Sequence, residues 1–542
     1  MSEAGKCRQN VEHLPTISLL ARRKQTTATS FAGFGYSLAA RLVDEFLSTS
    51  VSLPEKHLTL ILCTRSPSKT QATISRLRLH VQKLTQHPQA PRQFESQAKV
   101  AGEDSQWQEP AQRIHLLGVE ADLCNLKSIY ALADRLVNGT LLFPDSRGEQ
   151  LGYGLTEIDA RRAQCHTKKI GEQRMQGGNQ SIRIPRIDML FLTAGIGGWS
   201  GINWLSAMKD MCLDVVDAVT WPKYKIATVG ALARPQLEST RRKGLDDSAK
   251  PPQPVQTPLE EPALGEVFCA NVFGHYILAH ELMPLLSRPA TASCRSSSRI
   301  IWISSIQAAD EDFSIDDLQA LGSPTPYESS KRLIDLLVLT SELPSVRPLA
   351  TPFFDSDNTV TRRSNTQQTG AEEDVVVIRP KYYLAHPGVF ASDIMPLNFL
   401  LVLFGKFVLY LVRWLGSPWH TIQPYKAAVA PVWLATTRAE ALDQLEEGGL
   451  CKVKWGSATD TRGRERPKQT EVAGWGWDGR VGALPDAEQL HGRQRGATSV
   501  CREQRESFEN LGRQCWLQME GLRRDWESVL GLCAPAKEPT SP

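Results

Sequence analysis

Continuous apolar runs alternate along the chain with longer stretches in which apolar residues recur at the spacing of a helix. The runs are rich in Ile, Leu and Val and cover residues 57–63, 113–119, 187–193, 299–304 and 374–378. Runs of this kind are typical of strands buried on both faces of a sheet. The stretches between them predict helices over residues 36–47, 66–86, 126–137, 265–286 and 327–343. This alternation predicts an α/β fold, a Rossmann-like doubly wound parallel sheet.

Long polar stretches interrupt this alternation. They are rich in Pro, Gln, Ser, Thr, Arg and Asp and cover residues 87–112, 140–185, 222–263 and 346–373. We expect surface insertions or disordered loops, because these stretches hold too little apolar surface to offset the cost of ordering. The chain is expected to divide into an atypical N-terminal segment (1–32), a Rossmann-type domain with insertions (33–448) and a C-terminal extension (449–542). Mixed apolar and charged residues over 502–532 predict that a capping helix ends the extension.

The composition narrows the range of partners. The 542 residues include 62 Lys+Arg and 59 Asp+Glu, a net charge of +3, so the overall charge does not indicate a nucleic acid partner. The 11 cysteines are scattered without a C-x-x-C pair, which argues against a metal site and against a disulfide framework.

Residues 394–415 form a hydrophobic segment of 22 residues, about the length of a membrane span. Pro396, Asn398, Lys406 and Arg413 lie within it and would make a spanning helix costly. We therefore favour a helix that lies in the membrane interface with its apolar face towards the lipid. A helix that only covers the substrate as a lid, and a true span, are the alternatives.

A candidate catalytic group is centred on Tyr327 and Lys331. Four positions apart on a helix, the two side chains share one face, and the Lys331 ammonium is expected to lower the pKa of the Tyr327 phenol. Such a phenol suits proton exchange with a substrate oxygen. Ser305 ends a predicted strand, at the edge where open α/β sheets bind their ligands. Asn271 stands inside an apolar helical run, where a buried amide needs hydrogen-bond partners.

In this order the residues resemble the short-chain dehydrogenase/reductase family, in which Asn271, Ser305, Tyr327 and Lys331 would form the catalytic tetrad. The resemblance runs from about residue 33 to residue 434 and implies a set of cofactor-binding residues. They are Gly33, Gly35, Arg65, Asp122, Thr193, Ala194, Gly195, Tyr327, Lys331, Pro387, Gly388, Val389 and Ser392. Arg65 would pair with a 2′-phosphate, and no acidic residue occupies 63–66, which favours NADP(H) over NAD(H).

The closer similarity is to the fungal 3-ketosteroid reductases of ergosterol biosynthesis. It rests on residues 302–306, 327–333, 386–389 and 454–457. It implies reduction of a 3-keto sterol to the 3β-hydroxy sterol by NADPH during C4-demethylation, with Tyr327 as proton donor. Lys331 would bind the nicotinamide ribose, and Asn271 would position a water that relays protons. The similarity also implies an endoplasmic reticulum membrane location, with lipid droplets as a second location, and contact with other sterol C4-demethylation enzymes.

The N-terminal sequence departs from the family pattern. The first strand and half of the glycine turn are expected to be missing or replaced. A basic run at 22–24 stands where a buried strand belongs, and Thr29 stands where the turn needs glycine. Two alternatives therefore stay open beside the sterol reductase. One is a generic carbonyl or retinol-type short-chain reductase, and the other is a non-catalytic partner of sterol enzymes that has lost cofactor binding.

Overall fold

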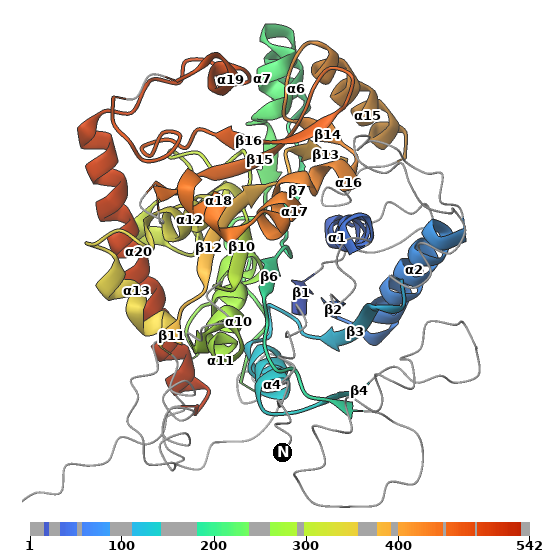
Figure 1. The fold of residues 1–542 in the computed structure, drawn as a ribbon. Coiled ribbons are helices and arrows are strands. Elements are labelled where there is room, and N and C mark those ends of the chain that lie inside the picture. The colour runs from blue at the N-terminus through green and yellow to red at the C-terminus, as the bar shows by residue number, and fades with distance from the viewer. Residues whose placement is uncertain are drawn as a thin grey trace, which may run out of the picture.

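An eight-stranded sheet runs through the centre of the computed structural model (Figure 1). The structure describes residues 16–20, 33–50, 57–86, 111–142, 181–237, 261–289, 297–355, 377–391, 399–447, 451–482 and 485–532. The strand order is β3 (Ile114–Glu120), β2 (Leu58–Thr64), β1 (Thr16–Leu20), β6 (Met189–Leu192), β10 (Arg299–Ile303), β12 (Lys381–His386), β15 (Lys454–Thr459) and β16 (Glu465–Thr470). All neighbours from β3 to β15 pair in parallel, and only β16 is antiparallel. The predicted doubly wound α/β fold is confirmed.

Strand β1 corrects the expectation that the first strand is missing. Thr16–Leu20 pairs in parallel with β2 on one side and with β6 on the other, and so fills the central position of the sheet. The expectation failed because it placed the strand next to the glycine turn, at 22–24, whereas the strand ends before this basic run. Residues 21–32, which include Thr29, lie outside the described part of the chain.

Helices cover both faces of the sheet (Figure 1). One face carries α1 (Phe34–Ser50), α2 (Pro67–Gln86), α16 (Pro424–Ala427), α17 (Val429–Thr436) and α18 (Ala439–Leu445). The other carries α4 (Leu126–Val137), α9 (Glu266–Phe268), η1 (Cys269–Phe273), α10 (Gly274–Glu281), α11 (Met283–Leu286), α12 (Pro326–Thr340), α13 (Arg347–Phe354) and α20 (Arg502–Val529). Successive residues of β2 alternate between the two cores, since Leu60 packs into one and Ile61 into the other.

Shorter elements surround these layers. Three helices, α6 (Trp204–Leu213), α7 (Val215–Thr220) and α15 (Phe399–Trp414), lie together at one end of the molecule (Figure 1). Four two-stranded sheets pair β4 (Leu141–Leu142) with β5 (Ser181–Ile182), β7 (Trp199–Ile202) with β8 (Lys225–Ala227), β9 (Arg288–Pro289) with β11 (Val377–Ile378), and β13 (Val389–Phe390) with β14 (His420–Ile422). The remaining elements are η2 (Ile315–Asp317) and α19 (Ala487–Leu490).

The strand predicted at 374–378 is described only at 377–378, and residues 374–376 lie outside the described part of the chain. Residues 377–378 do form a strand, but it pairs with β9 outside the central sheet, whereas the prediction places it within that sheet. The central strand is β12, which begins after Pro380 and aligns Lys381 with Arg299 of β10. Both runs are apolar, and the sequence pattern alone does not tell which of them pairs with β10.

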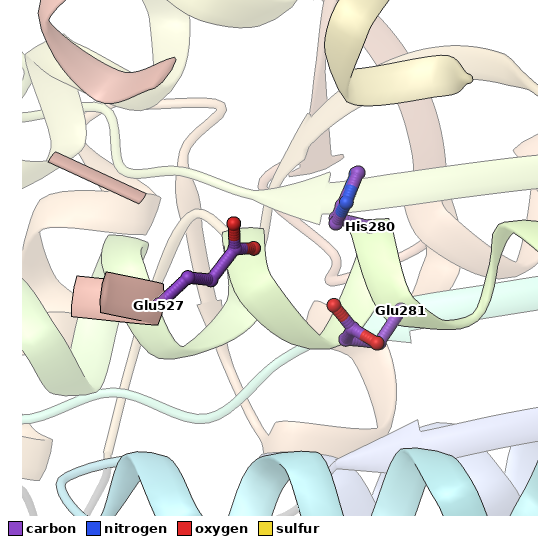
Figure 2. A group of neighbouring side chains, drawn as sticks. All are labelled: His280, Glu281 and Glu527. Atoms are coloured by element: carbon purple, nitrogen blue, oxygen red, sulfur yellow. The ribbon is translucent and has the colours of Figure 1, made fainter. Parts of the chain in front are cut away.

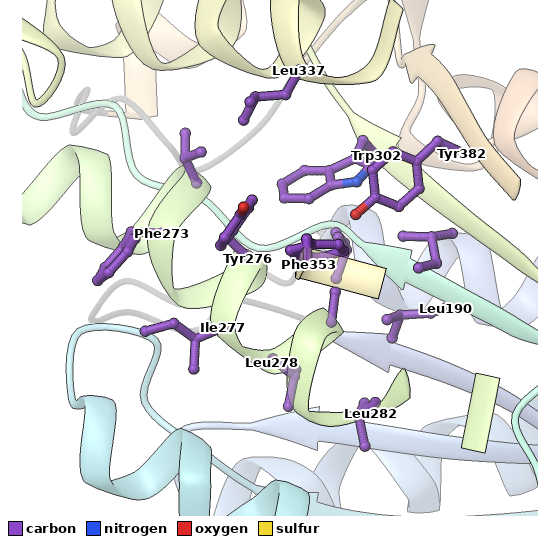
Figure 3. Close-up of a cluster of buried hydrophobic side chains, with 14 of the residues drawn as sticks. Leu190, Phe273, Tyr276, Ile277, Leu278, Leu282, Trp302, Leu337, Phe353 and Tyr382 are labelled. Carbon is purple, nitrogen blue, oxygen red and sulfur yellow. The ribbon is translucent and has the colours of Figure 1, made fainter. Parts of the chain in front are cut away.

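Part of the predicted insertion at 346–373 is a packed helix. Helix α13 buries Phe353 against the rings of Tyr276 and Tyr382, with centroids 4.4 and 5.9 Å apart (Figure 3). The predicted capping helix is α20, whose Trp516 side chain is buried and donates from Nε1 to the Leu337 carbonyl at 3.1 Å. Strands β15 and β16 extend the sheet past residue 448, so the predicted boundary there does not coincide with a sheet edge.

Candidate active site

The predicted site residues follow the carboxyl ends of parallel strands. Arg65 comes directly after β2, and Asp122 follows β3. Thr193, Ser305 and Pro387 follow β6, β10 and β12 in the same way. Carboxyl ends of parallel strands meet at one edge of a sheet, and ligands bind there near the point where the strand order reverses, which here lies between β1 and β6.

Asn271 lies fully buried in η1, a π-helical turn between α9 and α10. Its Oδ1 accepts the Ile196 N–H at 2.6 Å, and its Nδ2 donates to the Ile196 carbonyl at 3.0 Å and to the Ser330 hydroxyl at 2.9 Å. The amide therefore ties the segment after β6 to α12. Single π-turns inside helices are frequent at functional sites.

Gly195 brings the segment after β6 against two of the predicted catalytic residues. A Cβ added at this position would lie 2.9 Å from Asn271 Oδ1 and 3.9 Å from Lys331 Nζ. The first distance is too short for any side chain, so the close approach of the backbone requires glycine. The segment of Thr193, Ala194 and Gly195 thus meets Asn271 and Lys331.

Tyr327 stands in the first turn of α12, half-buried, with Ser305 beside it. Burial raises the pKa of the Tyr327 phenol to about 12, a hydrogen bond with Ser305 lowers it and the charge of Glu328 raises it. The phenol is therefore protonated at neutral pH. This corrects the expectation that Lys331 lowers the Tyr327 pKa, because burial dominates.

Lys331 is buried one turn further along α12, with Nζ 5.6 Å from the centre of the Tyr327 ring. Its Nζ donates to the Ile303 carbonyl at the end of β10, at 2.8 Å. Burial lowers the pKa of the Lys331 ammonium to about 7, the Asp335 carboxylate raises it and the Lys454 ammonium lowers it further. Lys331 can therefore change its charge near neutral pH.

A hairpin covers Tyr327 from the side. The Trp199 ring of β7 lies 4.8 Å from the Tyr327 ring, and Lys225 Nζ of β8 lies 4.3 Å from the Trp199 ring. Lys225 forms a buried ion pair with Glu328. Lys225 could not be predicted from the sequence, because it lies in the predicted insertion at 222–263 and meets α12 only through the fold.

A pocket opens beside the tetrad, at the ends of β2, β3 and β6. It brings together the predicted residues Arg65, Asp122, Ala194 and Gly195. Its other lining residues are Cys63, Ala121, Leu123, Cys124, Ile196, Glu266 and Ala270, which the sequence did not single out. Most of these are small or apolar, so their types carry no signal of binding. Asp122 is held by its Oδ1, which accepts the Cys124 N–H at 3.1 Å.

The remaining predicted residues lie near the start of α1. The Gly33 carbonyl accepts the Ser37 N–H at 3.2 Å as this helix begins, and Gly35 is buried in its first turn. The Phe34 ring between them lies 5.6 Å from the Phe390 ring. The surviving half of the glycine turn therefore adjoins the segment after β12.

That segment contains Pro387, Gly388 and Val389. Gly388 has φ +68°, and a Cβ there would lie 2.4 Å from the Trp419 carbonyl, so both conformation and space require glycine. Val389 donates its N–H to the same carbonyl at 2.7 Å. Neither contact joins the segment to the pocket, and Ser392 lies outside the described residues.

A separate group of potential metal ligands lies between α10 and α20. Figure 2 shows His280 and Glu281 facing Glu527, and their ligand atoms lie within 4.8 Å of one another. His280 Nδ1 lies 2.7 Å from the Phe353 carbonyl, and Glu527 forms an ion pair with Arg523. Because these groups already have protein partners, we assign no metal to them.

Comparisons with known proteins give close relatives in sequence, although no family model matches the chain. It is 37% identical over 515 residues to the 3-keto-steroid reductase ERG27 of Gibberella zeae, covering 92% of this chain and 93% of that protein. It is 36% identical over 504 residues to the 3-keto-steroid reductase erg27 of Aspergillus fumigatus, with the same two coverages. Among solved structures, the Pseudomonas aeruginosa RhlG/NADP active-site complex is 12% identical with a TM-score of 0.31, covering 78% of this chain and 88% of that one. A structural likeness this low carries no argument about the site.

Proposed function

The chain belongs to the fungal 3-keto-steroid reductase family, and on that premise we propose that it reduces a 3-keto sterol to the 3β-alcohol with NADPH. We place this step in the removal of the sterol C4 methyl groups. The observation that carries the proposal is that Asn271 and Lys331 meet at Gly195 while Tyr327 lies beside Lys331, at the carboxyl edge of the sheet.

The residues that line the pocket suit a nicotinamide dinucleotide. Asp122 and Arg65 line it at the ends of β3 and β2, where the adenosine half would lie. Gly195 lets the backbone of this segment approach Asn271 and Lys331, beside which the nicotinamide ring and its ribose would lie. The bound nicotinamide would supply the hydride. We propose NADPH rather than NADH, because the exposed Arg65 can pair with a 2′-phosphate and no acidic residue occupies 63–66.

The proton comes from Tyr327. Because its pKa is raised to about 12, the phenol carries its proton at neutral pH and can donate it to the oxygen of a ketone. Ser305 shares a hydrogen bond with this phenol, so its hydroxyl can hold the same substrate oxygen. Lys331 lies behind the ring and presents an ammonium where the ribose hydroxyls would lie. Asn271 fixes the Ile196 backbone that borders this space.

We also propose that α15 and α6 rest on a membrane surface, from which a sterol would enter. Among the residues that the structure describes, none of the helices combines the length and the apolarity that crossing a bilayer needs. Helix α15 exposes Leu403, Phe404 and Phe407, and α6 exposes Leu205 and Met208. A group of exposed large apolar side chains is typical of a membrane or protein contact.

The charges of α15 suit such a contact. The charge of Arg413 would be costly in a spanning helix. Its side chain is instead buried and turned towards the protein, with Cζ 4.8 Å from the centre of the Tyr410 ring. On its inner side α15 packs Val408 and Val412 against α7. The helix therefore lies along the protein with its apolar outer side exposed, as an interfacial helix does. We propose that this membrane is that of the endoplasmic reticulum, as the sequence resemblance implies.

Turnover of two substrates separates the candidate functions. The full-length chain in detergent is given NADPH with either a C4-demethylated 3-keto sterol or retinal, and the products are identified by mass spectrometry. We expect the 3β-sterol from the first and little product from the second. Comparable reduction of retinal would support a generic reductase, and no product from either would support a non-catalytic partner.

A further inference from the structure

We propose that Asp335 and Lys454 are positioning residues, a buried pair that holds the carboxyl end of β10 so that the Ser305 hydroxyl faces Tyr327. This inference rests on the proposed reductase function, in which Ser305 holds the substrate oxygen. Neither residue lines the pocket, and neither belongs to the tetrad. Their role would be exerted through Ser305 and Lys331.

Three successive residues at the carboxyl end of β10, namely Ile303, Ser304 and Ser305, are each held by a different side chain. Lys331 Nζ donates to the Ile303 carbonyl at 2.8 Å. The Ser304 hydroxyl donates to Asp335 Oδ1 at 2.5 Å. Lys454 Nζ donates to the Ser305 carbonyl at 2.7 Å. The strand end is thus fixed at three successive positions, and the third of these carries the substrate-binding hydroxyl.

Pairing between β10 and β12 ends at Ser304 and does not support the Ser305 carbonyl. The last backbone bond between β10 and β12 joins the Ser304 N–H to the Ala385 carbonyl at 2.8 Å. The next carbonyl, that of Ser305, is supported by Lys454 of β15, and β12 lies between β15 and β10. The lysine must therefore reach past the intervening strand. A buried carbonyl beyond the end of a sheet needs such a donor.

Asp335 keeps Lys454 in place. Its Oδ2 lies 2.5 Å from Lys454 Nζ, and the two side chains are 0% and 3% exposed. A lysine this deeply buried needs a paired charge, so removing the carboxylate alone would leave an unpaired ammonium. Asp335 also lies one helical turn after Lys331, so one carboxylate serves both lysines.

The charged groups around Lys331 come from several elements. Tyr327, Arg332 and Asp335 lie on α12, Lys454 lies on β15 and His275 lies on α10. Burial lowers the pKa of His275 to about 3, so this ring is neutral. Arg332 forms its own ion pair with Asp310. Asp335 is therefore the carboxylate that balances Lys331 and Lys454.

A second buried pair, Lys452 and Glu446, lies just before β15 and provides a matched control. Lys452 precedes Lys454 by two positions, and its Nζ donates to the Tyr382 carbonyl near the start of β12, at 2.8 Å. Glu446 lies 3.9 Å from it, and both side chains are buried. This pair also holds a strand carbonyl, but at the opposite end of the sheet from the site.

The test compares two double variants of the full-length chain. Asp335→Asn with Lys454→Met removes both charges of the pair at the site, the carboxylate that raises the pKa of Lys331 together with the ammonium that lowers it. Glu446→Gln with Lys452→Met removes both charges of the control pair. We expect the first to lower kcat roughly 10²-fold, because a small displacement of a positioned group has that effect. The KM and the Kd for NADPH should stay near the wild-type values. The control should keep most of the wild-type kcat.

The outcomes separate this inference from the proposed function. If the wild-type chain does not reduce the 3-keto sterol, the proposed function fails. If the wild type is active and the two double variants lose kcat equally, or neither loses it, the positioning role is wrong. Should the first double variant fail to fold, Ser304→Ala removes one of the three holds without touching a charge. It should lower kcat at unchanged NADPH affinity, and an unchanged kcat would overturn the inference.

Discussion

Asn271 holds Ile196 from both sides, accepting its N–H at 2.6 Å and donating to its carbonyl at 3.0 Å. The contact joins a π-helical turn to the segment after β6, which borders the pocket. It also holds the segment that carries Gly195 close to Lys331, and we expect the nicotinamide ring and its ribose to bind beside these two residues. The amide therefore shapes the site as well as stabilising the core.

Replacing Asn271 tests whether its side chain both shapes the site and stabilises the fold. Asn271→Leu keeps the volume but leaves the Ile196 N–H and the Ile196 carbonyl without their partner, so we expect a loss of about 3 kcal/mol in the free energy of unfolding. NADPH affinity should fall as well, because the backbone at Ile196 is released. Asn138→Leu is the control, an exposed position at the end of α4. Chemical denaturation and NADPH titration of both variants measure the effects, and equal behaviour would contradict the role.

Removing the proton donor should stop the reaction without affecting binding. Tyr327→Phe deletes the phenol oxygen and keeps the ring that packs on Trp199. We expect a fall in kcat of roughly 10³-fold, the range of a lost general acid, with an unchanged Kd for NADPH. Tyr382→Phe, a change in the core behind the sheet, should keep kcat near the wild-type value. Retained turnover in the first variant would contradict the tetrad.

The pKa of Lys331 predicts a pH dependence. Because this pKa is lowered to about 7, the free enzyme loses the ammonium as the pH rises through neutrality. Tyr327, with a pKa of about 12, stays protonated over the same range. We therefore expect kcat/KM for NADPH, which reports groups of the free enzyme, to fall above about pH 7. A profile that is flat from neutral to mildly alkaline pH would contradict this.

Asp335→Asn identifies the group that titrates. The Asp335 carboxylate raises the pKa of Lys331, so its removal should move the alkaline fall in kcat/KM to lower pH. Glu446→Gln, a buried carboxylate away from the site, should leave the profile in place. A fall that stays at the wild-type pH in Asp335→Asn would show that another group is responsible.

The exposed apolar side chains of α15 and α6 predict membrane binding. Phe404 is 60% exposed and Leu205 is 82% exposed, so replacing both with Asp removes two apolar contacts and adds charge. We expect at least about a tenfold loss of binding to phospholipid vesicles, since one buried side chain of this size contributes about 2 kcal/mol. Leu517→Asp is the matched control, because this α20 leucine is 61% exposed. Equal vesicle binding by all variants in a sedimentation assay would contradict the contact.

Much of the fold could be predicted from the apolar runs, because strands buried on both faces appear in the sequence as continuous hydrophobic segments. The runs at 57–63, 113–119, 187–193 and 299–304 became β2, β3, β6 and β10. Strand β1 was missed since it is only five residues long and lies away from the glycine turn. Its place is set by pairing with β2 and β6, which no local pattern contains.

The site was predictable where chemistry depends on residue type at a fixed spacing. Tyr327 and Lys331 share a helix face, and Ser305 ends a strand, so the sequence already placed them together. The support around them was not predictable. Asp335 and Lys454 are 119 positions apart, and each alone looks like a polar residue in an apolar element. The pKa of Tyr327 depends on burial, which the sequence does not state.

Titration of NADPH into the full-length chain tests the central claim most directly. The pocket beside Gly195 and the tetrad predict saturable binding with a micromolar Kd, followed by fluorescence, and weaker binding by Arg65→Ala. Binding of NADH should be weaker than that of NADPH in the wild type and similar to it in the variant. A wild-type chain that binds neither nucleotide would contradict the reductase and favour a non-catalytic partner of sterol enzymes.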